Sequence, residues 1–481
     1  MSELVIVWFR NDLRLEDHFA LHQAGLEQVP VLPVFIWDSG DESASSPGAA
    51  SRWWLHQSLQ QFQAALKDLN SRLVIRTGDP ARELGQLVRE TNAKALYWNR
   101  AYDPRAQALE QEVRSELSDE RLEIQTFPGN LLFEPGDIAT KQGTPYRVFS
   151  PFWKACLAGR QPEPPLPSPK KLCSPKVWPE SVSVKDLNLE PRIDWAEGLR
   201  ETWTPGSQGA KSRWKTFFPD VWLHYHETRD YPSDAGTSCL SPHLHFGEVS
   251  PRSLWQDISE FRFQNPSLAH AKSLTRFLAE LGWREFAHHV LFHFPKTVRQ
   301  PLREQFRKFP WKNKKSVLGK WQRGQTGYPI VDAGMRELWR TGWMHNRVRM
   351  IVGSFLTKDL LISWKHGAEW FWETLVDADL ANNTLGWQWI SGCGADAAPY
   401  FRIFNPVKQG QKFDPQGEYV RRWIPELGKM TSRWIHEPWN APENVLQEAG
   451  VILGENYPLP MVDHSLARKK ALEAFEVIKG E

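Results

Sequence analysis

Cysteine is scarce in this chain, with four residues among 481, and no two of them form a C-x-x-C pair. A chain of this length can bury a large core and does not need disulfides to hold it. The spacing of Cys156, Cys173, Cys239 and Cys393 therefore predicts a reducing, cytoplasmic compartment.

Long apolar runs are also missing, since no stretch approaches the ~20 residues that a membrane-spanning helix needs. The chain enters a predicted strand within a few residues of Met1, which leaves no room for a signal or transit peptide. We therefore expect a soluble protein without membrane contact.

The net charge is only +2, so the overall charge gives no argument for binding a polyanion. Positive charge is concentrated in the run RKFPWKNKK at 307–315, which as a run of charge is typical of a solvated face. Phe309 and Trp311 interrupt the run, and interleaved aromatics favour a loop that contacts a nucleic-acid backbone. His288, His289 and His293 lack the Glu-x-x-His partner of a zinc protease helix, and we expect no metal.

A dinucleotide-binding G-x-G-x-x-G does not follow the first predicted strand, which disfavours a dehydrogenase. Residues 1–130 nevertheless alternate apolar strands with amphipathic helices, the pattern of a doubly wound parallel α/β sheet. The strands are expected at 4–9, 31–37, 73–76, 95–98 and 124–127, and Pro33 predicts a bulge or an edge strand. Arg10, Asn11, Asp12 and Arg14 follow the first strand, where such sheets bind ligands, although these charges could equally pair with one another.

The rest of the chain divides into a linker and an all-helical domain. Residues 131–204 are expected to form the linker, because 162–191 is too rich in proline for helix or central strand. From 205 to 481 the apolar spacing is helical, with helices expected at 267–294, 332–340, 343–361 and 369–374. Gly342 after Arg340 and Thr341 predicts a helix stop.

Tryptophan is abundant, with 25 residues, and several of them occur around the stretch DADLANNTLGWQWISGCGADAAPYFRIFNP at 377–406. Asp379, Asn383 and Trp387 recur at i, i+4 and i+8, so on a helix they share one face, and Trp389 is expected where that helix ends. A carboxylate, an amide and an indole form an unusual mixture for a core stripe. A buried helix with a satisfied polar network is the alternative explanation of the pattern.

This stretch resembles the flavin-binding signature of the photolyase/cryptochrome family, and most closely that of class III photolyases for cyclobutane pyrimidine dimers, which are related to plant cryptochromes. The similarity extends from VWFRNDLRLED at Val7 to EYVRRWIPEL, which ends at Leu427, and so covers nearly the whole chain. The resemblance implies an α/β domain joined by a linker to an all-α FAD-binding domain. It also implies a monomeric enzyme in which reduced FAD, excited by blue light, splits a pyrimidine dimer flipped out of UV-damaged DNA.

The resemblance assigns a set of residues to the flavin. A turn of small hydroxyl residues would cradle the diphosphate, and by pattern alone such a turn is commonly only a helix cap. Cys239 departs from the family, which usually has a basic or polar residue there. Asn383 matches the position beside flavin N5, and Arg349 would pair with Asp377 beside the ring. The full set is Tyr225, Thr237, Ser238, Cys239, Leu240, Ser241, Phe277, Arg284, Arg349, Asp377, Ala378, Asp379 and Asn383.

A second set matches lesion and DNA contacts. Glu280 would hydrogen-bond the damaged base and Trp283 would stack on it, although a Glu and an Arg at i, i+4 are usually only a surface pair. Asn346 and Met350, at i and i+4, would face the same pocket, although an amphipathic helix with Met as filler is the simpler explanation. The remaining members of the DNA-binding set are Arg229, Arg347 and Trp389.

Trp387, Trp364 and Trp311 match the three indoles that relay electrons from the surface to the flavin in this family, although the sequence alone predicts ordinary core residues. The α/β domain of the family can also hold an antenna, methenyltetrahydrofolate or a deazaflavin, and no residue here tells which. Two other functions remain open: a cryptochrome photoreceptor and a photolyase for the (6-4) photoproduct. Asn383 and Trp283 argue against the first, and Met350 against the second, because a thioether cannot transfer a proton.

Overall fold

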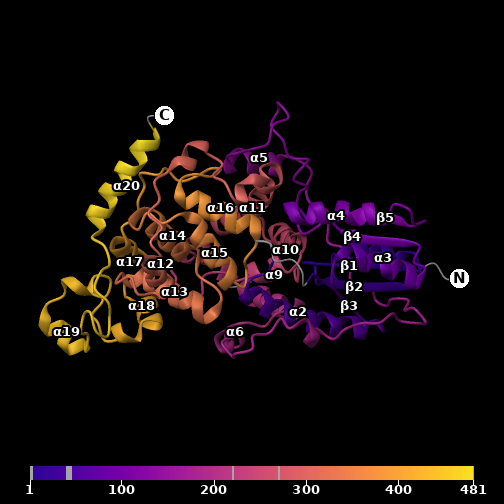
Figure 1. Ribbon diagram of the computed structural model, residues 1–481, viewed down its shortest axis with the longest axis horizontal. Coiled ribbons are helices and arrows are strands. Elements are labelled where there is room, and N and C mark those ends of the chain that lie inside the picture. Colours follow the sequence, from indigo (N-terminus) through magenta and orange to yellow (C-terminus); the bar gives the residue numbers. More distant parts are fainter. Residues whose placement is uncertain (1–3, 39–45, 219–220, 269–270, 480–481) are drawn as a thin grey trace.

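A computed structural model describes residues 4–38, 46–218, 221–268 and 271–479. Near the N-terminus a five-stranded sheet is formed by β1 (Val5–Phe9), β2 (Val31–Trp37), β3 (Val74–Thr77), β4 (Ala95–Asn99) and β5 (Glu123–Phe127). All pairings are parallel and the order is β3-β2-β1-β4-β5, which confirms the doubly wound sheet. This domain and the helical region occupy opposite ends of the molecule (Figure 1).

Helices cover both faces of the sheet, because each buried strand directs alternate apolar side chains to opposite sides. The face formed by residues such as Val5 and Val7 packs on α1 (Phe19–Leu26) and α2 (Ala49–Asp68). The other face packs on α3 (Pro80–Thr91) and α4 (Pro104–Glu116). Aspartate N-caps followed by proline begin both α3 and α4, which makes their starting points predictable from sequence.

The prediction that Pro33 marks an edge or a bulge is wrong. β2 lies between β1 and β3, and its register with β1 runs without interruption through Pro33 opposite Val7. Pairing with β3 begins only at Val34. Proline therefore stands at a position that has one hydrogen-bonding neighbour strand, where the missing N–H is tolerated.

The segment expected as a linker, 131–204, contains regular structure of its own. It includes α5 (Phe149–Ala158), the 3-10 turn η1 (Val184–Leu187) and α6 (Glu197–Thr202). Helix α5 packs into the helical core through Phe152 and Trp153, whereas Leu172 and Leu187 pack against the α/β domain. The segment thus ties the two regions together, and the domain boundaries themselves stay a prediction.

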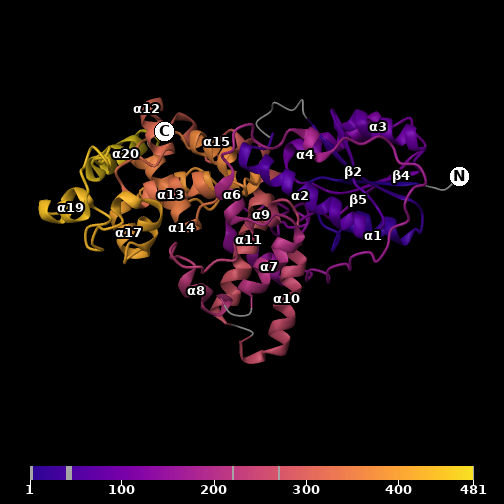
Figure 2. The same cartoon turned by 90° about the horizontal axis from the view of Figure 1, so that it is seen from below.

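Beyond Phe127 the described residues contain no strand, as expected for an all-α domain. Part of this region, including α8, α10 and α11, extends to one side of the molecule (Figure 2). The elements are α7 (Ser207–Phe217), η2 (Val221–His224), α8 (Tyr225–Thr228), α9 (Ser241–His245), α10 (Pro251–Gln264), η3 (Pro266–Leu268), α11 (Lys272–His293), η4 (Pro295–Val298), η5 (Glu304–Lys308), α12 (Lys315–Gln322), α13 (Pro329–Thr341), α14 (Asn346–Ser354), the π-helix η6 (Phe355–Asp359), α15 (Trp364–Thr374), α16 (Leu380–Ser391), α17 (Pro406–Phe413), α18 (Glu418–Trp423), η7 (Pro425–Leu427), η8 (Pro438–Asn440), α19 (Glu443–Ala449) and α20 (His464–Lys479).

Helix ends show where the sequence prediction holds and where it does not. Gly342 ends α13 with a φ of 66°, which confirms the predicted stop. The helix expected at 343–361 begins only at Asn346, because the His345 side chain caps it. The helix expected at 267–294 is described from Lys272, and 269–270 lie outside the described residues. Trp389 does not end α16, which continues to Ser391 and stops at Gly392.

Two hydrophobic cores build the helical region, and α16 lies between them. Trp387 and Ile390 belong to one core, and Ala381 and Leu385 belong to the other. The polar face of α16 is therefore enclosed by α11, α14 and α15, which all contact it. No helix in the described ranges combines the length and the apolarity needed to cross a bilayer.

Candidate active site

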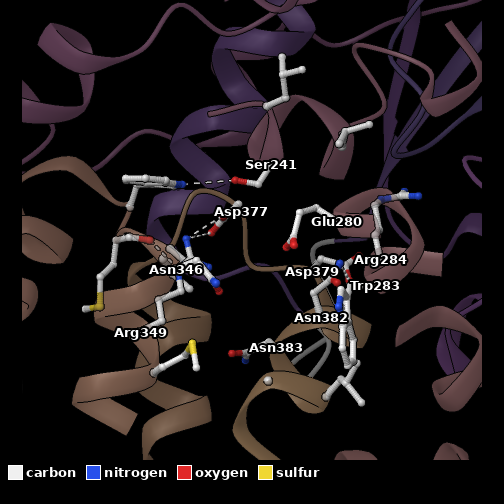
Figure 3. Close-up of a pocket in the computed structure, with 18 of the residues that line it drawn as sticks. Ser241, Glu280, Trp283, Arg284, Asn346, Arg349, Asp377, Asp379, Asn382 and Asn383 are labelled. Carbon is white, nitrogen blue, oxygen red and sulfur yellow. Dashed lines mark hydrogen bonds and ion pairs between the residues drawn. The ribbon is translucent and has the colours of Figure 1, made fainter. Parts of the chain in front are cut away.

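A cavity of about 530 Å³ opens along α16, with walls supplied by α11, α14 and the turn before α9. Its size is within the range of sites that enclose a cofactor-sized ligand. Figure 3 shows Glu280, Asn346, Asp377 and Asn383 around the same space, although they come from distant parts of the chain. Most residues that the sequence assigned to flavin and lesion line this one cavity.

The face of α16 carries Asp379, Asn383 and Trp387 into the cavity, as the i, i+4, i+8 spacing predicts. Asp379 is the N-cap, and its Oδ1 accepts from the Asn382 backbone N–H at 2.8 Å. Asn383 donates from Nδ2 to the carbonyl oxygen of Ala368 at 3.0 Å. A Cβ at Gly386 would meet no atom within 4 Å, so this part of the helix leaves open space for a ligand.

The ion pair expected between Arg349 and Asp377 is present. Arg349 Nη2 lies 2.8 and 3.0 Å from the two carboxylate oxygens, and Nε donates to the carbonyl oxygen of Met344 at 2.7 Å. Asp377 is 8% exposed. A charge-assisted, partly buried pair of this kind is held in one geometry and can present a fixed dipole to a bound ligand.

The wall formed by α11 presents Phe277, Glu280, Trp283 and Arg284. Glu280 forms an ion pair with Arg229, so this carboxylate is not an ordinary surface group. Arg229, predicted to contact DNA, lines the cavity with a side chain that is largely buried, and its Nη1 also bonds the Tyr225 hydroxyl at 3.4 Å; the contact with DNA stays a prediction. The structure gives Arg229 the position of a group that orients Glu280.

Trp283 stacks on Phe149 of α5, with ring centroids 3.9 Å apart. One face of its indole is therefore fixed against the protein core. Because Trp283 also lines the cavity, the packing holds a large aromatic surface at the wall where a base could stack.

Helix α14 places Asn346 and Met350 on the cavity, as their spacing predicts. Arg347 pairs with Asp230 at 2.9 Å and lies over the Phe413 ring at 4.3 Å. Arg347, Met350 and Trp389 also line a second cavity of about 430 Å³ beside the first. These three side chains form the partition between the two spaces.

The hydroxyl-rich turn contributes less of the wall than expected. Ser238, Leu240 and Ser241 line the cavity, whereas Thr237, Cys239 and the buried Ala378 are not among its lining residues. Cys239 has a φ of 49° and its Sγ lies 3.5 Å from Thr237 Oγ1. Burial raises the pKa of the Cys239 thiol. The Cys239 side chain therefore helps to fix the turn.

The three tryptophans expected as a relay all belong to the same core. Trp387 lines the cavity and Trp364 is buried, while Trp311 is partly buried at the edge of the cluster. The Trp387 ring also contacts Phe371 at 4.9 Å and fits closely over Gly367, where a Cβ would lie 2.1 Å from the ring. The relay itself stays a prediction.

Several residues that line the cavity were not predicted, among them Asn382, Gly386, Trp343 and His245. Asn382 and Gly386 stand at i+3 and i+7 from Asp379, on the same helix face as Asn383 and Trp387, so helical spacing was the signal that could have found them. Trp343 donates from Nε1 to Ser241 Oγ at 3.3 Å. The only sequence feature that pointed to Trp343 was its position directly before Met344. His245 carried no sequence signal, because only the fold brings α9 to the cavity.

The charged side chains that follow β1 are paired, but mainly with residues outside their own group. Arg10 pairs with Glu110 at 2.8 Å, and His18 Nε2 lies 2.9 Å from Asp12. The antenna therefore stays a prediction without a supporting contact. The three histidines of α11 have different partners: His288 faces Asp379, His289 accepts from the Tyr146 N–H, and His293 contacts the Pro135 carbonyl.

Comparisons with known proteins agree with this geometry. The family model described as the FAD binding domain of DNA photolyase matches residues 277–477, and the one described as DNA photolyase matches 5–170. The chain is similar to the deoxyribodipyrimidine photo-lyase of Agrobacterium fabrum, with 47% identity over 99% of this chain and 98% of the relative. It is also similar to cryptochrome-1 of Arabidopsis thaliana, with 41% identity over 98% of this chain and 70% of the relative.

A solved structure resembles the whole molecule. It is the bacterial class III photolyase from Agrobacterium tumefaciens, with a TM-score of 0.95, 46% identity, and coverage of 100% of this chain and 98% of that chain. Fold, cavity and sequence similarity extend together over both domains. The chain therefore belongs to the photolyase/cryptochrome family.

Proposed function

We propose that this protein is a light-driven DNA repair enzyme, a deoxyribodipyrimidine photo-lyase that splits cyclobutane pyrimidine dimers. The observation that carries the proposal is that one cavity holds both the flavin-side groups, Arg349–Asp377 and Asn383, and the lesion-side groups Glu280 and Trp283. An electron can pass directly between two ligands only if they lie close together, and a shared cavity supplies that proximity.

The residues present fit a flavin. The open space at Gly386, the hydroxyls of Ser238 and Ser241, and the fixed Arg349–Asp377 pair supply room, phosphate donors and an oriented charge. Reduced FAD, when bound and excited by blue light, supplies the electron for dimer cleavage. The chain's own residues hold and orient it and exclude water.

Asn383 favours repair over signalling. An amide beside the flavin tolerates the negative charge of the reduced cofactor, whereas a carboxylate at that position repels it. The amide is fixed by its bond to Ala368, so its orientation does not depend on the ligand. The cavity therefore suits a flavin that is kept reduced.

The lesion side is arranged for a flipped pyrimidine pair, since photolyases act on bases extruded from the helix. Glu280 offers a carboxylate acceptor to a base N–H, and Trp283 offers a stacking surface fixed by Phe149. Met350 has no proton to transfer, which favours the cyclobutane dimer over the (6-4) photoproduct.

A cryptochrome is the second candidate, because cryptochrome-1 of Arabidopsis is 41% identical and the family fold serves both functions. The decisive experiment uses purified, reduced protein and two oligonucleotides, one with a thymine cyclobutane dimer and one with a (6-4) photoproduct. We expect light-dependent repair of the first alone and none in the dark. Absence of repair of both, with FAD bound and photoreducible, would assign the chain to the cryptochromes.

The finer features of this proposal have their own tests. We propose that the protein acts as a monomer in the cytoplasm, and light scattering of the purified protein, free and bound to damaged DNA, tests the first point. We also propose an antenna in the α/β domain, methenyltetrahydrofolate or a deazaflavin. Extraction and absorption spectra of the chromophores in the purified protein test its presence and identity.

A further inference from the structure

Two histidines from different helices converge on one carboxylate oxygen at the cavity. His288 Nε2, on α11, lies 3.4 Å from Asp379 Oδ2, and His245 Nδ1, at the end of α9, lies 3.8 Å from the same atom. The other oxygen of Asp379 is occupied by the backbone and side-chain N–H groups of Asn382, both at 2.8 Å. The oxygen that faces the imidazoles is therefore the one whose charge has no other partner among these contacts.

His288 is the more closely placed of the two imidazoles and is 13% exposed. Its Nδ1 is buried without a hydrogen-bond partner in the described part of the chain, and its Nε2 is directed at Asp379 Oδ2. Asp379 is therefore the group that favours a positive charge on this ring.

The charged groups around His288 are few. Asp379 faces it from the start of α16, and His245 approaches the same carboxylate from α9. On its own helix, Glu285 interacts with it but is occupied by Arg284 at 3.3 Å and by the backbone N–H groups of Leu132 and Phe133. Asp379 is thus the carboxylate that a proton on His288 neutralises.

The electrostatics of Asp379 agree with this geometry. Burial alone would raise the pKa of its carboxyl, but the facing imidazoles outweigh that cost and hold the pKa well below its usual range. Asp379 stays anionic, and the charge of the group as a whole is decided by the histidines.

We infer that His288 is a titratable counter-ion of Asp379 and therefore a positioning residue that sets the electrostatic environment of the flavin in this cavity. With His288 protonated, the pair is neutral and the reduced, more negative cofactor is favoured. With His288 neutral, Asp379 is uncompensated beside the ligand and the oxidised cofactor is favoured. This inference rests only on the flavin part of the proposed function.

The test compares the wild-type holoprotein with His288→Arg, a permanent cation, and His288→Gln, a permanent neutral group. The ratio of reduced to oxidised FAD is measured by absorbance in the dark, at equilibrium with a reference dye, from pH 5.5 to 9. His366→Arg on the surface of α15 is the control, because His366 pairs with Glu369 at 3.3 Å and is not one of the described residues that line the cavity.

We expect the ratio of reduced to oxidised FAD in the wild type to match that of His288→Arg at low pH and that of His288→Gln at high pH. Between those limits, the ratio of reduced to oxidised FAD in the wild type should fall more steeply with pH than it does in either variant. The extra fall is up to about tenfold per pH unit, because one extra proton is linked to reduction. If His288→Arg does not fold, the inference is still tested by comparing the wild type with His288→Gln, because their FAD ratios should become equal at high pH.

Two results overturn it. Wild-type and His288→Gln curves that run parallel over the whole range show that no histidine proton is linked to reduction. Loss of the extra pH dependence in His245→Gln, with its retention in His288→Gln, assigns the proton to the other ring. Neither measurement uses DNA or light, so a failure to repair dimers leaves this test unaffected.

Discussion

The side chain of Asn383 donates a hydrogen bond from Nδ2 to the carbonyl oxygen of Ala368 at 3.0 Å. This bond joins α16 to α15 and determines which end of the amide faces the neighbouring helix. An amide can donate there and a carboxylate cannot, so the residue type is fixed by the protein as well as by any ligand.

We predict that Asn383→Asp destabilises both the fold and the reduced flavin. The carboxylate would face the Ala368 carbonyl with acceptor against acceptor, at a cost of about 1–3 kcal/mol. Its charge would also disfavour the reduced cofactor. Urea unfolding and the fraction of reduced FAD at a fixed dye potential measure the two effects.

The matched control for Asn383→Asp is Asn313→Asp. Asn313 is exposed, and its Oδ1 accepts from the Ser363 N–H at 2.9 Å, a bond that aspartate retains. Equal flavin reduction in Asn383→Asp and in the wild type would contradict the role given to the amide.

Glu280 is predicted to act on the lesion and not on the flavin. Glu280→Ala should weaken binding of the dimer on the order of tenfold, because a hydrogen bond to a charged group is lost, while FAD remains bound. It also leaves the buried Arg229 without its nearest carboxylate. Glu280→Gln retains an acceptor oxygen and should keep more of the repair activity.

The measurement is the repair yield of a dimer-containing oligonucleotide, together with the FAD content of each variant. Release of FAD from Glu280→Ala, or full repair by it, would disprove this assignment.

Trp364→Phe is predicted to block light-driven reduction of oxidised FAD but not repair by chemically reduced enzyme. Phenylalanine fills most of the buried site but is much harder to oxidise than an indole. The control is Trp339→Phe, an exposed ring that stacks on Trp370 at 5.9 Å. Photoreduction as fast in Trp364→Phe as in the control would exclude Trp364 from the relay.

Much of this architecture could be predicted because it depends on local pattern. Apolar runs such as 4–9 become buried strands, and the spacing of Asp379, Asn383 and Trp387 places them on one face of α16. The turns that end helices also depend on local sequence, as Gly342 shows by ending α13 with a positive φ. These features need no knowledge of distant residues.

Other parts of the site arise only when the chain folds. The contact of Arg229 with Glu280, and the approach of His245 and His288 to Asp379, join segments that no periodicity connects. Pro33 was misjudged for the same reason, since the tolerance of a strand for proline depends on where its neighbour strand begins. Long-range packing decides these positions.

Glu337 gives the last prediction, a pH dependence of stability. It is buried on α13, and its Oε2 accepts from the Tyr419 hydroxyl at 2.6 Å and from the His345 N–H at 3.3 Å, directly before α14. Desolvation raises the pKa of Glu337 from 4.5 to about 7 in the folded state. The folded protein therefore binds more protons here than the unfolded chain does between those values.

The sign of the effect follows from linkage: the stabilisation from this group is fully present below about pH 4.5 and is lost as the pH rises through about 7. Glu337→Gln keeps one oxygen to accept both hydrogen bonds but cannot ionise. From pH 5 to pH 8 the wild type should therefore lose roughly 2–3 kcal/mol of unfolding free energy relative to this variant. Urea unfolding of both proteins at the two pH values measures the difference, and a constant difference would show that Glu337 titrates normally in the fold.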